Sequence, residues 1–221
     1  MIPDDKTLTE SGLAPTVDTT GGKARILLLA CGALAHEILT LIKLNGWDHI
    51  SLTCLPANLH LYPDRIPAAV EEVVQKHRAD YDDIFVVYAD CGTGGMLQKK
   101  CAELGVEMMQ GPHCYSFFEG NEAFAKISEN ECTAFYLTDF LVRQFDAFVW
   151  KPMGLDRHPE LLEMYFGNYE KLVYQAQTDA PELDEKARDC ARRMGLAYER
   201  RFTGYGELES AISSVAKNSN Q

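Results

Sequence analysis

The stretch IFVVYADCGTGG, residues 84–95, decides the fold. Its first half is a short, almost continuous apolar run, and its second half is a turn rich in glycine. An apolar run bounded by glycines is typical of a buried strand in a parallel sheet. The stretch therefore predicts a strand over residues 84–89, followed by a loop and by a helix that ends near Leu104.

The same order of strand, loop and helix recurs on both sides of this stretch. Apolar runs predict strands over residues 26–31, 50–55 and 106–110, and residues 33–45 and 68–78 have the apolar spacing of helices. These repetitions favour an α/β fold with a doubly wound, mostly parallel, Rossmann-like sheet and helices on both faces. Later segments predict helices over residues 134–145 and 159–166, and then a βαβ-like unit over residues 171–177, 182–194 and 197–202.

The chain shows no low-complexity segment and no clear linker, so a single α/β domain is expected over residues 25–215. Residues 1–24 are polar and acidic and predict a disordered lead-in, and residues 216–221 predict a disordered tail. The lead-in lacks the basic and apolar regions of a signal peptide. No apolar stretch reaches the roughly 18 residues of a membrane span, so no membrane association is expected.

Charge and cysteine content narrow the class of protein further. The formal net charge is −12 and no basic stripe occurs, which argues against binding to nucleic acid or to an anionic membrane surface. The seven cysteines are an odd number and follow no signal peptide. This pattern favours reduced thiols in a cytoplasmic protein over a disulfide framework.

Several cysteines lie at or near the predicted carboxyl ends of strands. Ligands of open parallel sheets bind outside these ends, so thiols that are far apart in sequence are expected to converge there. Thiolate and imidazole ligands suit zinc or an iron–sulfur cluster. The sequence predicts a metal site drawn from the following residues: Cys31, Cys54, His60, Cys91, His113 and Cys114.

Two other interpretations of these cysteines stay open, because no CxxC pair occurs. Free cysteine is among the most buried residue types, so the thiols could simply pack in the core. Alternatively, Cys91 or Cys114 is a covalent nucleophile, with His113 as its base and Asp90 beside Cys91 as a further catalytic candidate. Cys91 has the best individual case, because a helix N-terminus lowers the pKa of a thiol.

The turn after Cys91 is a second candidate site. Its backbone N–H groups could bind a phosphate or carboxylate of a cofactor, through residues Gly92, Thr93, Gly94 and Gly95. The turn matches neither the GxGxxG nor the Walker pattern, so nucleotide binding has little support. A tight strand-to-helix turn that needs small residues is the competing interpretation.

Two residues nearer the C-terminus are candidates for binding substrate. Arg157 could bind a substrate carboxylate through its planar guanidinium, although its neighbours could serve only to cap a helix. Tyr205 lies in the segment TGYG, residues 203–206, which could close over the crevice or form a simple turn.

Seven motifs in order resemble one known family. They are ACGAL (30–34), TCLPANLH (53–60), YADCGTGG (88–95), GPHCYSFFEG (111–120), FYLTDFLVRQFD (135–146), GLDRHPEL (154–161) and TGYGELE (203–209). Together they resemble the domain of unknown function family 1638, over about residues 25–208. Members occur in bacteria and methanogenic archaea, and their genes often neighbour corrinoid-dependent methyltransferases for methylamines or betaines. The resemblance implies a role in one-carbon or methylated-amine metabolism and assigns no catalytic residue.

Three functions therefore stand as hypotheses. The first is a cytoplasmic metalloprotein, with an iron–sulfur cluster or zinc, that acts on a small molecule and is linked to a corrinoid methyltransferase system, with contact to the corrinoid itself left open. The second is a metal-free enzyme with a nucleophilic cysteine. The third is a non-catalytic small-molecule-binding or accessory protein. Convergence of the sulfur atoms of Cys31, Cys91 and Cys114 would favour the first, and the oligomeric state stays open.

Overall fold

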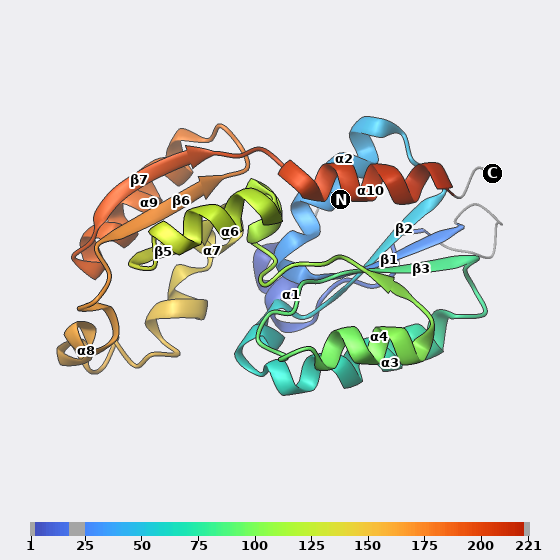
Figure 1. The fold of residues 1–221 in the computed structure, drawn as a ribbon, viewed down its shortest axis with the longest axis horizontal. Helices are drawn as coiled ribbons and strands as arrows, with labels where there is room; N and C mark the ends of the chain where they lie inside the picture. Colours follow the sequence, from blue (N-terminus) through green and yellow to red (C-terminus); the bar gives the residue numbers. More distant parts are fainter. Residues whose placement is uncertain (1–2, 18–24, 219–221) are drawn as a thin grey trace. The chain divides into compact units, whose positions relative to one another are not determined.

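A computed structural model describes residues 3–17 and 25–218, which form two compact units (Figure 1). Unit 1 comprises residues 1–114 and 207–221, and unit 2 comprises residues 115–206. The expectation of a single domain over residues 25–215 thus differs from the structure. Each unit has a parallel sheet of its own, and no change of composition marks the boundaries at residues 114–115 and 206–207.

Unit 1 contains a four-stranded sheet in the order β2-β1-β3-β4, and all of its strands are parallel. The strands are β1 (Ile26–Cys31), β2 (Ile50–Leu55), β3 (Asp83–Val87) and β4 (Glu107–Met108). Every residue of β1 and β2 is buried, as expected for strands covered on both faces. The doubly wound α/β fold predicted from the sequence is confirmed, and β1 and β2 have the predicted bounds.

Helices cover both faces of this sheet. They are η2 (Gly32–Leu34), α2 (Ala35–Asn45), η3 (Ala57–Leu61), η4 (Pro63–Arg65), α3 (Ile66–His77), α4 (Met96–Leu104) and α10 (Gly206–Asn218). Figure 1 shows α3 and α4 on one side of the sheet and α2 and α10 on the other. The spacing of Ile38 and Leu41 buries one stripe of α2, and Gly46 ends the helix with a left-handed φ of 62°.

The segment before β1 is ordered where the structure describes it. Helix α1 (Asp5–Glu10) buries Leu8 completely, and Leu13 forms an antiparallel bridge with Cys54 on the edge strand β2. A Cβ atom on Gly12, whose φ is +74°, would lie 2.1 Å from the carbonyl oxygen of Cys54, so this close approach requires glycine. The prediction of a disordered lead-in is wrong for residues 3–17, because two leucines in a polar segment suffice to dock it. Residues 1–2 and 18–24 lie outside the described part of the chain.

The prediction of a disordered tail over residues 216–221 is wrong for its first three residues, which belong to helix α10. Helix α10 continues through residue 218, and its side chains Ile212 and Ala216 are buried. The apolar stripe therefore extends into residues that were assigned to the tail. Residues 219–221 lie outside the described part.

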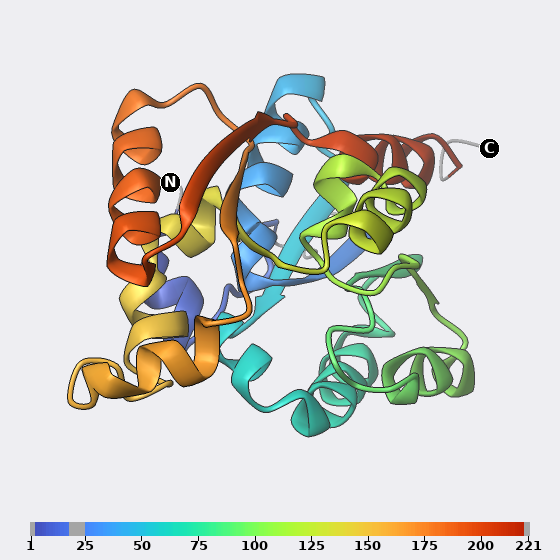
Figure 2. The ribbon, with the colours of Figure 1, turned by 60° about the vertical axis from the view of Figure 1, so that its left-hand side comes forward.

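Unit 2 contains a three-stranded parallel sheet in the order β5-β6-β7. Its elements are α5 (Ser116–Glu119), α6 (Asn121–Asn130), β5 (Ala134–Thr138), α7 (Asp139–Arg143), η5 (Asp146–Trp150), η6 (Pro159–Leu161), α8 (Leu162–Phe166), β6 (Lys171–Ala176), α9 (Pro181–Met194) and β7 (Ala197–Phe202). The βαβ-like unit is confirmed, and Figure 2 shows α9 beside β6 and β7. The helix predicted over residues 134–145 is wrong for its first five residues, which form β5.

Both faces of the sheet in unit 2 are also covered. On one face, the ring of Phe124 from α6 packs edge-on against Tyr136 of β5, with the ring centroids 5.4 Å apart. On the other face, the hydroxyl of Tyr198 in β7 donates to Asp184 of α9 over 2.5 Å. Within the described residues of the two units, no helix combines the length and the apolar character that crossing a membrane requires.

Candidate functional site

The predicted cysteines belong to the carboxyl edge of the sheet in unit 1. The chain goes from β1 to β2 on one side and then crosses back to β3 on the other side. This reversal makes the ends of β1 and β3 the topological switch point, where open α/β sheets bind their ligands. Cys31 is the last residue of β1, Cys54 is the fifth of six residues in β2, and Cys91 follows β3 by a few residues.

Two of the cysteines are in direct contact. The Sγ atoms of Cys91 and Cys114 lie 3.1 Å apart. The backbone beyond β3 brings them together, because the N–H of Asp90 donates to the carbonyl of Gly111 over 2.9 Å and the N–H of Cys91 donates to that of Pro112 over 3.0 Å. These bonds continue the alignment of β3 with β4 past the ends of both strands. The register of two neighbouring strands therefore sets this contact.

Cys91 has a backbone conformation that is uncommon for a residue with a side chain. Its φ is +48°, the only positive value for a non-glycine residue within the described chain. The carboxylate of Asp90 stabilises the turn: it accepts hydrogen bonds from the Thr93 hydroxyl over 2.8 Å, from the N–H of Gly94 over 3.1 Å and from the N–H of Gly95 over 2.6 Å. Strained residues held in this way cluster at functional sites.

The same hydrogen bonds bear on the predicted phosphate cradle. The N–H groups of Gly94 and Gly95 point at the chain's own Asp90 carboxylate, and the Gly95 amide holds the pKa of that carboxyl below its usual value. The carboxylate of Asp90 therefore already accepts the hydrogen bonds that a phosphate or carboxylate ligand would need. The structure favours the tight-turn interpretation of residues 92–95, and it gives Asp90 a positioning role beside Cys91.

The two sulfur atoms in contact differ in their affinity for a proton. Cys91 has its pKa lowered to about 5, first by a hydrogen bond from Cys114 and further by the imidazole of His60. The pKa of Cys114 is raised, because its proton is held in the bond to Cys91. Either sulfur can be the donor in this contact, and the lowered pKa of Cys91 favours a thiolate there with Cys114 as the thiol donor. Burial lowers the pKa of His113, whose ring also lies within the field of Cys91 and His60.

Cys31 and Cys54 stay protonated. Burial raises the pKa of Cys31 to about 12, and it raises that of Cys54 well above its usual value. The charge of Cys91 raises the pKa of Cys31 further, which places Cys31 in the neighbourhood of the pair. Neither buried thiol is a nucleophile at neutral pH.

Tyr88 is a further residue of the site, and the sequence did not predict it. This residue follows β3 directly and is only 2% exposed, and its hydroxyl lies near the Cys31 thiol. Among the residues that the structure describes, no nitrogen or oxygen atom is hydrogen-bonded to this hydroxyl, and its polar neighbour is the Cys31 thiol. The one signal in the sequence was a tyrosine inside an otherwise apolar run, immediately before ADC.

The predicted metal centre requires at least three suitably placed donors. Within residues 3–17 and 25–218, no group of three or more His, Cys, Asp or Glu side chains has an arrangement that could hold a metal ion. The metal site, with zinc or an iron–sulfur cluster, therefore stays a prediction. The contact between Cys91 and Cys114 is the part of it that the structure assembles.

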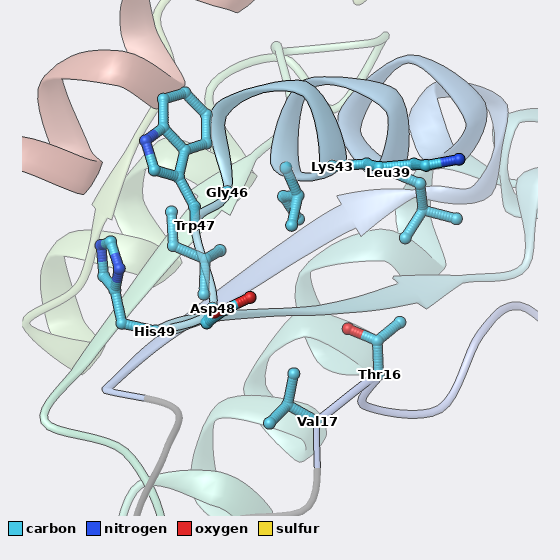
Figure 3. A pocket seen from close by; sticks show the side chains of 10 residues that line it. Thr16, Val17, Leu39, Lys43, Gly46, Trp47, Asp48 and His49 are labelled. Atoms are coloured by element: carbon cyan, nitrogen blue, oxygen red, sulfur yellow. The ribbon is translucent and has the colours of Figure 1, made fainter.

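The remaining predicted residues and the described cavity lie elsewhere. Arg157 is exposed, 3.8 Å from Asp156, and Tyr205 is half-buried; both belong to unit 2, and their substrate roles stay predictions. A cavity of about 780 Å³ in unit 1 lies at the start of β2, at the opposite end of this strand from Cys54 (Figure 3). Its lining includes Thr16, Leu39, Lys43, Trp47, Asp48 and His49, none of which was a candidate.

Fold and site together define a doubly wound α/β protein with two free cysteines in contact at the switch point of its first sheet. Residues 54–212 match the model of the family described as "Protein of unknown function (DUF1638)". The match spans most of the sequence, so the chain belongs to this family, and the resemblance found from its motifs is confirmed. Neither the curated proteins nor the solved structures contain a match.

Proposed function

We propose that this chain is an enzyme whose Cys91 thiolate attacks a small electrophilic molecule. The observation that carries the proposal is the 3.1 Å contact between the sulfur atoms of Cys91 and Cys114 at the switch point. A thiolate, and not a thiol, is the reactive form of cysteine. A thiol donor at this distance stabilises the thiolate before any substrate arrives.

The proposal changes the role expected of His113. Because Cys91 has a pKa of about 5, it needs no base to deprotonate it at neutral pH. His113 has a lowered pKa and is therefore neutral there. In the proposed mechanism a water molecule attacks the adduct on Cys91, His113 accepts the proton of that water, and Cys91 leaves as a thiolate, which His60 helps to keep ionised.

The substrate in this proposal is a small, partly polar molecule. Cys91 is only 6% exposed, which leaves room for a compact reagent to approach but not for a macromolecule. The buried hydroxyl of Tyr88, beside the Cys31 thiol and without a nitrogen or oxygen partner among the described residues, supports a polar group on the substrate. A methylated amine or another one-carbon compound, handled together with a corrinoid methyltransferase system, stays the proposed substrate class on the strength of the family resemblance alone.

Competitive alkylation of the reduced protein tests the proposal. At about pH 6, iodoacetamide should modify Cys91 at least tenfold faster than the exposed Cys132, as read by mass spectrometry of each cysteine peptide. Cys101→Ser, which removes a buried thiol of α4, should leave this rate unchanged, and Cys91→Ser should remove the fast reaction. Equal rates at Cys91 and Cys132 would overturn the proposal. So would stoichiometric iron or zinc in anaerobically purified protein that is lost in Cys91→Ser.

A further inference from the structure

The sulfur atoms of Cys91 and Cys114 lie close enough for the two thiols to be candidates for a disulfide bond. Both thiols are free, and their sulfur atoms are 3.1 Å apart, about 1 Å more than the length of a disulfide bond. The backbone hydrogen bonds beyond β3 already place the two residues side by side. No other pair of sulfur atoms among the described cysteines is in hydrogen-bond contact.

The two cysteines have different roles in the formation of a disulfide. Cys91 reacts first, because Asp90 holds it in a strained turn with a φ of +48°, and the lowered pKa of Cys91 and the raised pKa of Cys114 agree with this order. The charge of Cys91 is part of what keeps Cys114 protonated. When Cys91 has formed a covalent bond, that charge disappears, and Cys114 becomes easier to deprotonate at the moment when its attack is needed.

We propose that Cys91 and Cys114 carry out thiol–disulfide exchange with low-molecular-weight disulfides, Cys91 attacking first and Cys114 resolving the adduct. This inference rests on the proposed nucleophilic role of Cys91 and adds an oxidant class and a second reacting residue.

The reaction exchanges S–S bonds in two steps. The Cys91 thiolate attacks one sulfur of the small disulfide, a new S–S bond forms, and the first small thiolate leaves with the electron pair. Cys114 then loses its proton, and its sulfur attacks the sulfur of Cys91 and expels the second small thiolate. The protein dithiol is oxidised to a disulfide, and the small disulfide is reduced to two thiols.

The neighbouring cysteines do not compete for this step. Cys31 and Cys54 are as buried as Cys91, but their raised pKa values keep them as thiols. The strained turn at Cys91, held by Asp90, aims this sulfur at Cys114. The geometry therefore points to one specific disulfide.

The experiment treats the reduced full-length protein with 2-hydroxyethyl disulfide and follows released thiol and peptide masses. The wild type should release two small thiols per chain and give a Cys91–Cys114 crosslinked peptide. Cys114→Ser should release one thiol and stop at a mixed disulfide on Cys91, and Cys91→Ser should release at least tenfold less thiol over the same time. Cys101→Ser should behave as the wild type.

Two results would overturn the inference. In one, the wild type stops at the mixed disulfide while Cys114 stays reduced, which leaves the nucleophilic role of Cys91 intact and removes only the exchange reaction. In the other, Cys91 closes onto Cys31 instead. Absence of any adduct on Cys91 would remove both this inference and the proposed function.

Discussion

Replacing Cys114 by alanine is expected to raise the pH at which Cys91 becomes reactive. The hydrogen bond from Cys114 is the largest of the effects that lower the pKa of Cys91. A hydrogen bond to a charged group contributes about 1.5–3 kcal/mol, which corresponds to a shift of about 1–2 pH units. The rate of alkylation at Cys91, measured as a function of pH, should have its midpoint near 5 in the wild type and higher in Cys114→Ala.

Cys114→Ser is the matched control for this prediction. Serine keeps a hydroxyl that can donate to the thiolate, so the midpoint should stay low even though the variant can form no disulfide. The stabilisation of the thiolate and the exchange chemistry are thereby separated. An unchanged midpoint in Cys114→Ala would show that this contact does not hold the charge on Cys91.

The largest effect on stability is expected at Asp139 in unit 2. This carboxylate is 1% exposed and accepts hydrogen bonds from the Tyr174 hydroxyl over 2.7 Å, from the N–H of Gln177 over 3.1 Å, and from the N–H and the hydroxyl of Thr178 over 3.1 and 2.6 Å. Asp139→Ala leaves all of these donors buried or partly buried without their acceptor. We expect the free energy of unfolding to fall by roughly 3–5 kcal/mol.

Urea denaturation, combined with hydrogen exchange of β6, measures this loss in unit 2. Asp179→Ala is the control, because Asp179 has a largely exposed side chain and forms a surface ion pair with Arg200 over 2.8 Å. Surface pairs contribute about 0–1 kcal/mol, so the control should hardly change stability. A loss below about 1 kcal/mol in Asp139→Ala would contradict the account of this network.

Asp139 also shows where the sequence was informative and where it was not. The segment FYLTDFLVR, residues 135–143, carries apolar residues at a spacing that suits a helix, and a helix was predicted throughout. The structure forms strand β5 first, because pairing with β6 buries Leu137, and the helix begins only at Asp139. Tertiary pairing overrode a local pattern, and the second sheet was missed with it.

The strands of unit 1 were predictable for the opposite reason. Each of β1, β2 and β3 is a short apolar run with a clear end. A strand that is buried on both faces has apolar residues at nearly every position, so this run identifies it. The docking of residues 3–17 was not predictable. It depends on the burial of Leu8 and on the bridge between Leu13 and Cys54, which is distant in the sequence.

The candidate site was predicted in part. The rule for strand ends led to Cys31, Cys91 and Cys114, and the structure places Cys31 at the end of β1 and brings Cys91 against Cys114. It could not say that the sulfur atoms of Cys91 and Cys114 lie 3.1 Å apart, or that Asp90 accepts hydrogen bonds from amides of the turn. These facts depend on differences of one or two ångströms in loop geometry, which the spacing of residues in a sequence does not contain.

The pKa of Cys91 also links its charge to folding. Folding lowers this pKa from 9.0 to about 5, so the native state favours the thiolate. The contribution of Cys91 to the free energy of unfolding is therefore fully present above about pH 9 and is lost as the pH falls through about 5. The same charge can be observed directly, because thiolates absorb in the ultraviolet and thiols do not.

The most direct test of the central claim is the difference in thiolate absorbance between the reduced wild type and Cys91→Ser, titrated from acid to alkaline pH. The account predicts a difference of one thiolate per chain at neutral pH, with a midpoint near 5. A difference that stays at zero until the pH approaches 9.0, the ordinary value for a cysteine, would contradict it.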